Sequence, residues 1–284
     1  MTHPLLQAGI SIDIIPLPPN RKGNDMCELT ERVTSVCIEA GIILQDYAHR
    51  GFKVNSKEGT ELVTEADTAA EEFLKSELLG ILPEASFIGE ETWDGIIPDP
   101  PAWIVDPLDG TNNYAAGIPF YCISVALADR EGLLLGCVYD PLRKEMFTAR
   151  RDEGAWLNGK RIAVSSALSL SDAIIATGFP YSRKENNLTF DLDVLKRFLG
   201  RVRGIRRCGS AALDLAYTAA GRLGGFWEEK LNLWDMAAGV LLVREAGGNI
   251  TGFREETWTT KSPGVQCSTP GVWNEFRELI GKCP

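Results

Sequence analysis

The stretch WIVDPLDGTNNY, from Trp103 to Tyr114, joins an apolar segment to an unusual group of polar residues. Its apolar start is typical of a buried strand, and two acids, Asp106 and Asp109, follow with Pro107 between them. A glycine and a threonine come directly afterwards. A turn uses some of these residue types but does not need all of them. We therefore interpret the stretch as a core strand whose end carries a functional site.

Composition and charge narrow the class of protein. The chain has 284 residues, enough for one large domain or for two halves that share a core. No apolar run approaches the length of a membrane span, so we expect no membrane partner. The net charge of −10 argues against nucleic acid as the main partner. An anionic substrate would therefore need bound cations beside it.

The cysteines and histidines exclude several kinds of site. Seven cysteines are scattered without a C-x-x-C pair, which indicates reduced residues in a cytoplasmic protein. The two histidines, His3 and His49, argue against a Ser-His-Asp triad or a multi-histidine zinc site. Residues 1–25 lack the pattern of a signal peptide and any periodicity, and we expect them to form a mobile extension.

Apolar spacing and turn residues predict the arrangement of elements. Helical spacing runs from Met26 to about Arg50. Residues 52–61 are polar and indicate a loop, and the spacing of Thr64 and Asp67 fits a capping box at the start of the next helix.

Later segments indicate hairpins in the first half and alternation of strands and helices in the second. We therefore expect a mixed α/β (α+β) chain of layered sheets and helices. The expected halves are 26–164 and 165–284.

Acidic residues gather at the predicted ends of elements. They are Glu90, Glu91, Asp106, Asp109 and Asp235. Clusters of oxygen ligands suit Mg²⁺, and carboxylates brought together need counter-charge. Taken alone, an acid at such a position is usually a turn or helix-cap residue, and only the combination favours a functional site.

The residues that follow Asp109 predict an anion-binding site as well. Gly110 and Thr111 are expected to open a short helix, where free backbone N–H groups favour an anion. Thr111 can hold a water against an upstream carboxylate such as Asp67, while a metal lowers the pKa of that water. The combination points to hydrolysis of a phosphate ester.

Together these motifs resemble the inositol monophosphatase family in order, type and spacing. They are GEE at 89–91, DPLDGT at 106–111 and WDMAAG at 234–239, extended by LVTEAD at 62–67, TGFPY at 177–181 and GSAA at 209–212. The resemblance covers about residues 26 to 280 and is greatest to the bacterial branch. It implies a layered α-β-α-β-α sandwich of the inositol monophosphatase and fructose-1,6-bisphosphatase type.

The resemblance also implies a role for each matching residue. The first metal would be held by Glu90, Asp106 and the carbonyl of Leu108. The second would be held by Asp106, Asp109 and Asp235, and a third, weaker metal would touch Glu90. Asp67 and Thr111 would position the attacking water. The amides of Gly110 and Thr111 would hold the phosphate, and the substrate would also contact Asp109, Ala211, Glu228 and Asp235.

The implied enzyme is a cytoplasmic, homodimeric phosphatase with two or three Mg²⁺ per site and inhibition by Li⁺. A metal-activated water would attack phosphorus in line, with no covalent intermediate. We expect inositol-1-phosphate or a similar small polyol phosphate, since Glu228 accepts hydrogen bonds from hydroxyls and repels a second phosphate.

Other substrates of the family remain alternatives: fructose 1,6-bisphosphate, histidinol phosphate, adenosine bisphosphates and dinucleotide phosphates. Four basic residues can hold a second phosphate, although a surface charge or a dimer contact is the better explanation of each: Arg183, Lys184, Arg206 and Arg207. The family's loop lysine would be Lys53 or Lys57.

The sequence also allows two other functions, a phosphatase of a different family and a binding protein. LDGT also resembles the first motif of haloacid-dehalogenase phosphatases, but their nucleophile position is taken by Pro107, which has no nucleophilic group. Some bacterial relatives bind the transcription machinery, so a non-enzymatic binding role is the alternative from a different class.

Overall fold

The structure is a computed structural model that describes residues 24–56, 62–179 and 192–281. Helix α1 begins at Asn24, two residues before the expected helix start at Met26, and residues 1–23 of the expected extension lie outside the described residues. Lys57, Arg183 and Lys184 lie outside them too. No helix in the described ranges is long and apolar enough to cross a membrane.

Two long helices form the first layer, α1 at Asn24–Arg50 and α2 at Glu65–Ile81. The predicted capping box starts α2. The Thr64 side chain accepts hydrogen bonds from backbone amides, and the Asp67 carboxylate accepts one from the Thr64 amide. The loop predicted at 52–61 was partly wrong, because Val54–Ser56 (β1) pairs antiparallel with Leu62–Thr64 (β2). The chain turns back along the strand that leads into α2, which gives this polar segment backbone partners.

The first large sheet has seven strands in sequence order. They are β3 (Ser86–Gly89), β4 (Ala102–Asp109), β5 (Cys122–Asp129), β6 (Gly132–Asp140), β7 (Glu145–Arg150), β8 (Gly154–Leu157) and β9 (Lys160–Ile162). β3 and β4 are parallel, and every later pair is antiparallel. The predicted hairpin between β5 and β6 is confirmed. The short helix α3 (Thr111–Ala115) follows β4 directly, as Gly110 and Thr111 predicted.

The second sheet has five strands in the order β11-β10-β12-β14-β13. They are β10 (Ile174–Thr177), β11 (Gly204–Arg206), β12 (Gly225–Glu229), β13 (Asn249–Gly252) and β14 (Gly264–Ser268). The accompanying helices are α4 (Leu192–Phe198), α5 (Ala211–Ala219), α6 (Leu233–Glu245) and α7 (Trp273–Ile280), with 3₁₀ turns at Leu170–Asp172 and Pro270–Val272. β10 and β12 are parallel, so their carboxyl ends lie at the same edge.

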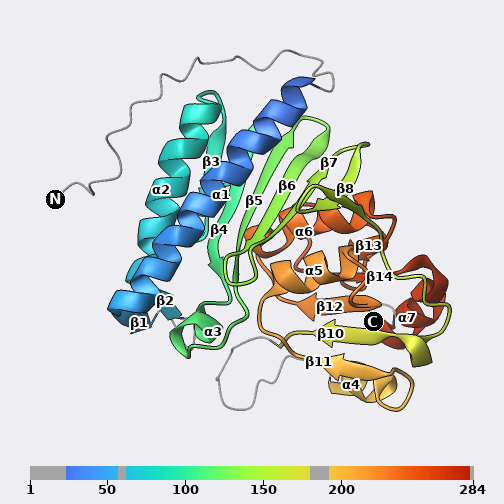
Figure 1. The fold of residues 1–284 in the computed structure, drawn as a ribbon. Helices are drawn as coiled ribbons and strands as arrows, with labels where there is room; N and C mark the ends of the chain where they lie inside the picture. Colours follow the sequence, from blue (N-terminus) through green and yellow to red (C-terminus); the bar gives the residue numbers. More distant parts are fainter. Residues whose placement is uncertain (1–23, 57–61, 180–191, 282–284) are drawn as a thin grey trace.

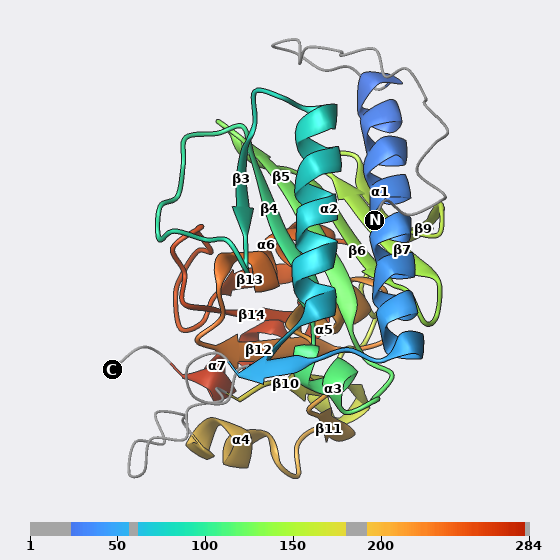
Figure 2. The ribbon, with the colours of Figure 1, turned by 90° about the vertical axis from the view of Figure 1, so that its left-hand side faces the viewer.

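The helices and sheets alternate as five layers (Figure 1). α1 and α2 lie side by side on one face of the seven-stranded sheet (Figure 2), α5 and α6 lie between the two sheets, and α4 and α7 cover the far side. This confirms the predicted α-β-α-β-α architecture. One apolar core joins α5 and α6 to residues of both sheets. The division near residue 165 therefore stays a prediction.

A shift of register in β4 separates its two acids. Asp106 lies opposite Ser124 of β5, whereas Asp109 lies opposite Cys122. Two residues of β4 thus face a single residue of β5, which is the arrangement of a β-bulge. Pro107 falls within the bulge, where the missing amide of a proline is tolerated.

The bulge also decides which way the acids face. Before it, Ile104 belongs to the core around α5 and α6, and Val105 to the core under α1 and α2. Leu108 belongs to the α1–α2 core, although regular alternation from Val105 would place it on the other side. Asp109 consequently faces α5, the same layer that Asp106 faces. The extra residue therefore brings two acids three positions apart to one side of the sheet.

Candidate active site

Asp67 and Thr111 meet although 44 residues separate them. The Thr111 hydroxyl lies 3.0 Å from Asp67 Oδ1 and 3.0 Å from the Leu108 carbonyl oxygen, so its one proton is shared between these two acceptors. Asp67 is buried and also accepts the Thr64 amide at 2.8 Å. Burial raises the pKa of Asp67, against the lowering by hydrogen bonds from Thr64 and Thr111. The predicted pair for positioning water is thus assembled beside the Leu108 carbonyl.

Asp106 lies at the centre of the predicted acids. Its side chain is buried, and Oδ1 accepts the Leu108 amide at 2.9 Å, across the bulge. Burial raises the pKa of Asp106 well above its ordinary value, and the neighbouring charges of Glu90, Asp109 and Asp235 raise it further. The four carboxylates predicted as metal ligands are therefore close enough to repel one another.

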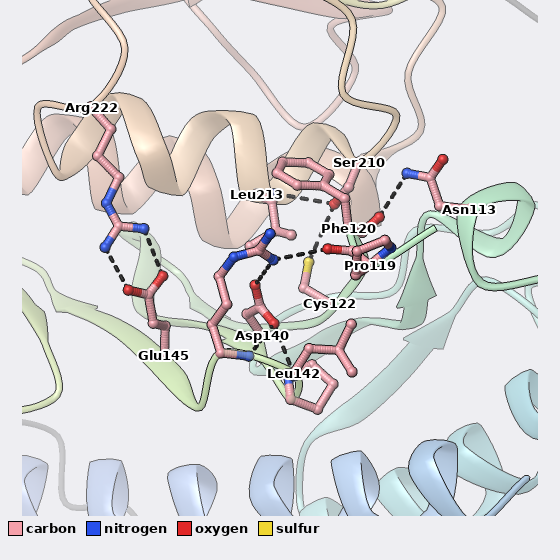
Figure 3. A network of polar contacts seen from close by, with 12 residues as sticks. Asn113, Pro119, Phe120, Cys122, Asp140, Leu142, Glu145, Ser210, Leu213 and Arg222 are labelled. Carbon is pink, nitrogen blue, oxygen red and sulfur yellow. Dashed lines mark hydrogen bonds and ion pairs between the residues drawn. The ribbon is translucent and has the colours of Figure 1, made fainter. Parts of the chain in front are cut away.

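Asp109 is held by the start of α5. Its Oδ2 accepts the Ser210 hydroxyl at 2.7 Å and the Ala212 amide at 2.7 Å. Burial raises the pKa of Asp109 to about 6, and the bonds from Ser210 and from the Ala212 and Ala211 amides oppose this rise. Ser210 also lies 3.5 Å from the Cys122 sulfur of β5 (Figure 3). Ser210 was not among the predicted site residues, although its position as the N-cap before a helical run was a usable signal.

Asp235 and Glu228 come from the second half of the chain. Asp235 lies in the first turn of α6 and accepts the Asn232 amide at 2.7 Å. Burial and the charge of Asp109 raise the pKa of Asp235 well above its ordinary value. The preceding residue, Trp234, is buried, and its carbonyl accepts the Ser124 hydroxyl at 3.2 Å, which fixes α6 to β5.

Glu228 lies near the end of β12, at the same edge of the sheet as the end of β10. Burial raises the pKa of Glu228 to about 8, while the charge of Arg207 lowers it. Gly178, just after β10, makes room for this side chain, because a Cβ there would lie 1.9 Å from the Glu228 carboxylate. Arg207 also lowers the pKa of Asp109. The side chains of Arg206 and Arg207 are both exposed.

The backbone at Gly110 admits only glycine without strain. Its φ is +103°, and a Cβ would lie 3.0 Å from the Phe120 carbonyl oxygen and 3.3 Å from that of Gly209. Asn113 fixes the same surroundings, because its Nδ2 donates to the carbonyls of Phe120 at 2.7 Å and Cys208 at 2.9 Å. The turn after β4 is therefore packed tightly against the segment that leads into α5.

A network of polar contacts links this turn to the turn between β6 and β7 (Figure 3). Arg143, in the turn between β6 and β7, donates Nη1 to Asp140 Oδ2 at 2.8 Å and to the Pro119 carbonyl at 3.0 Å. Pro119 precedes Phe120, whose carbonyl accepts Asn113. The β6–β7 turn thereby braces the segment on which Gly110 rests.

The residues gathered here fit the motifs from which the family resemblance was drawn. A model of the inositol monophosphatase family matches residues 25–282, nearly the whole described chain. The chain belongs to the inositol monophosphatase family. The predicted enzyme class, a phosphoric monoester hydrolase, is confirmed with it.

Several members of the family are similar over most of their length. An inositol-1-monophosphatase of Rhizobium meliloti is 42% identical over 233 residues, which are 81% of this chain and 87% of that protein. A protein named Nus factor SuhB from Pseudomonas aeruginosa is 44% identical over 208 residues, 71% of this chain and 76% of its own. The crystal structure of the extragenic suppressor protein suhB of Bartonella henselae has a TM-score of 0.84 at 36% identity, covering 90% of this chain and all of that one.

The donor set of this family member fits a hard cation. Its acids raise one another's pKa, which shows that the cluster needs positive counter-charge. All its predicted ligands are oxygen atoms, as Mg²⁺ prefers. Within the described residues, no three His, Cys, Asp or Glu side chains already stand at the spacing that encloses a metal ion. The mutual effects on pKa place these carboxylates near one another, at wider spacing than direct ligands of one ion.

Proposed function

We propose that the protein is a Mg²⁺-dependent phosphomonoesterase that hydrolyses inositol-1-phosphate or a similar small polyol phosphate. The observation that carries this proposal is the position of Asp106. It is buried among Glu90, Asp109 and Asp235, on a strand whose next turn brings Thr111 onto Asp67. A cluster of repelling carboxylates beside a hydroxyl–carboxylate pair is what metal-assisted attack by water on a phosphate ester requires.

As the family resemblance implies, one Mg²⁺ would be held by Glu90, Asp106 and the Leu108 carbonyl, and a second by Asp106, Asp109 and Asp235. Bound Mg²⁺ supplies positive charge to the phosphate and lowers the pKa of a water in the site. Asp67 holds the Thr111 hydroxyl, which leaves the Thr111 oxygen oriented toward an incoming water. The raised pKa of Asp67 suits this carboxylate to take a proton from that water.

The phosphate is proposed to rest on the amides of Gly110 and Thr111, where the glycine lets the backbone approach closely. Glu228 is proposed to contact the hydroxyls of the substrate, together with Asp109 and the Ala211 backbone. With a pKa of about 8, Glu228 can donate as well as accept a hydrogen bond near neutral pH, which suits a polyol.

Arg207 favours a substrate with a second phosphate, but its charge is already directed at Glu228 and Asp109. We therefore retain the polyol monophosphate. Rates measured side by side on inositol-1-phosphate, fructose 1,6-bisphosphate, histidinol phosphate and adenosine 3′,5′-bisphosphate test the choice. A bisphosphate as the best substrate by kcat/KM would overturn it.

Asp106→Asn tests the reaction itself. The variant should keep the fold, lose activity on every phosphate ester and bind Mg²⁺ more weakly, because it removes the carboxylate shared by both proposed ions. Phosphate release at fixed Mg²⁺ and calorimetric titration with Mg²⁺ measure the two effects. Turnover close to that of the unaltered protein would sink the two-metal mechanism. Inhibition by Li⁺ and a homodimer in sedimentation are further expectations of the same proposal.

A second candidate function is binding to the transcription machinery. It is favoured by the relatives named Nus factor SuhB, of which the Pseudomonas aeruginosa protein is 44% identical. The inactive Asp106→Asn variant separates the two functions. If that variant still replaces such a relative in an assay of transcription, then the binding role exists and does not need catalysis.

A further inference from the structure

Helix α2 brings a second buried acid to the site. Glu71 lies four residues after Asp67, so both project from the same face of the helix. Its side chain is 1% exposed. Glutamate is rarely buried this completely unless it has a specific partner. Nothing in the proposed mechanism uses Glu71, and its burial therefore needs a separate explanation.

Two neighbours of the proposed metal ligand Glu90 meet the Glu71 carboxylate. Its Oε2 accepts the backbone amide of Glu91 at 2.8 Å. On the other side of Glu90, a Cβ on Gly89 would lie 2.6 Å from the Glu71 carboxylate, so the absence of a side chain at 89 makes room for it. The Glu90 amide in turn donates to the Val105 carbonyl of β4 at 3.2 Å. The two residues on either side of Glu90 are therefore next to Glu71: Gly89 lies against its carboxylate, and the Glu91 amide donates a hydrogen bond to it.

The environment of the second oxygen, Oε1, indicates that Glu71 has a role other than stabilising the fold. Oε1 is buried and has no hydrogen-bond partner among the described residues. A buried acceptor without a partner opposes folding, and such groups in native proteins call for a functional reason. An apolar residue of similar size would avoid this penalty.

We propose that Glu71 is a positioning residue that holds the turn bearing Glu90 in the orientation for binding metal. The inference rests on the proposed function, since it assumes that Glu90 is a metal ligand. Through Asp67 and Glu71, one rigid helix sets both the water-positioning pair and the Glu90 ligand. Carboxylates and other groups that orient metal ligands from behind change metal affinity by about 10–100-fold when they are altered.

Two variants separate positioning from bulk structure. Glu71→Leu removes the acceptor for the Glu91 amide. Glu71→Gln keeps an oxygen acceptor on a side chain of the same length. Titration with Mg²⁺ alone, in the absence of substrate, should show affinity weakened about 10–100-fold in Glu71→Leu. Glu71→Gln should bind within a few-fold of the unaltered protein. Thermal melting in EDTA should show that both variants are folded, because Glu71→Leu also removes the buried oxygen that has no partner and Glu71→Gln keeps the acceptor for the Glu91 amide.

Glu245→Gln is the matched control. Glu245 also receives backbone amides, from Asp152 at 2.9 Å and Gly154 at 2.8 Å. It lies ten residues after Asp235 on α6, about 15 Å along the helix from the acids. This variant should melt at a lower temperature and bind Mg²⁺ with unchanged affinity.

The outcomes are distinct. Unchanged Mg²⁺ affinity in a folded Glu71→Leu variant overturns the proposal, and so does Glu71→Gln binding as weakly as Glu71→Leu, because then the hydrogen bond is not what matters. Should Glu71→Leu not fold, Gly89→Ala displaces the same carboxylate from the other side, and unaltered Mg²⁺ affinity there has the same meaning. If the unaltered protein neither binds Mg²⁺ nor releases phosphate, the proposed function itself has failed instead.

Discussion

Replacing Asp109 by asparagine should stabilise the metal-free protein while it disables the enzyme. The two short hydrogen bonds to Asp109, from Ser210 and from the Ala212 amide at 2.7 Å each, end on the single atom Oδ2. The carbonyl oxygen of asparagine can receive both of them. Asp109→Asn therefore keeps the local structure, removes one negative charge from the acid cluster and places an amide NH₂ where the metals are proposed to bind.

The size of the effect follows from the pKa of Asp109, which is raised from 3.8 to about 6 in the folded protein. An acid with a raised pKa adds stability below its unfolded pKa, and that stability is lost as pH rises through the folded value. About two pH units at 1.36 kcal/mol each give a loss of at most about 3 kcal/mol above pH 6. For a chain of this size that is a difference of at most about 6–12 °C in Tm.

The assay is denaturation by urea and by heat in EDTA at pH 4, 6 and 8, beside phosphate release with Mg²⁺. At pH 4 the variant and the unaltered protein should be about equally stable. At pH 8 the variant should be the more stable one, with activity reduced by more than about 100-fold. A variant that is no more stable at pH 8 than the unaltered protein, or a stability difference that does not change with pH, would refute the reasoning.

Three further expectations concern the same site. Mg²⁺ binding at pH 6.5 should release protons, seen as a calorimetric enthalpy that depends on the buffer, because burial holds the pKa of Asp109 at about 6; an enthalpy independent of buffer contradicts this. Thr111→Val should lower kcat about 10²–10⁴-fold by removing the contact with Asp67, at nearly unchanged Mg²⁺ affinity, and Thr111→Ser should restore it. Gly110→Ala should cost about 1–3 kcal/mol in urea denaturation, because φ is +103° and the new Cβ meets the Phe120 carbonyl; a change below about 0.5 kcal/mol would show that the turn relaxes freely.

Local patterns predicted much of this molecule from its sequence. The capping box at Thr64, the hairpin between β5 and β6 and the helix opened by Thr111 all depend on residues close together in the chain. Such features follow from spacing alone. The five-layer architecture, in contrast, came from the family resemblance and not from periodicity.

The contacts that hold the site together were harder to foresee. Ser210 was quoted within a motif, but its bond to Asp109 joins segments 101 positions apart. Glu71 lies in a helix in which charged residues are common, and only its burial distinguishes it. The pairing of Val54–Ser56 in a polar segment likewise depends on a partner strand and not on composition. Long-range contacts of this kind leave no periodic trace in a single sequence.

The bulge in β4 has a consequence for how the spacing of this motif can vary. A motif with two acids two positions apart needs only a regular strand, because alternate residues already face the same way. Here the acids are three apart, and the chain reaches the same result by inserting a residue. Deleting Leu108 would keep both acids and could restore a regular strand, yet it would remove a buried side chain of the α1–α2 core and the residue whose carbonyl is proposed to bind metal. The distance between Asp106 and Asp109 in the sequence is thus tied to an irregularity of the backbone, and neither can change alone.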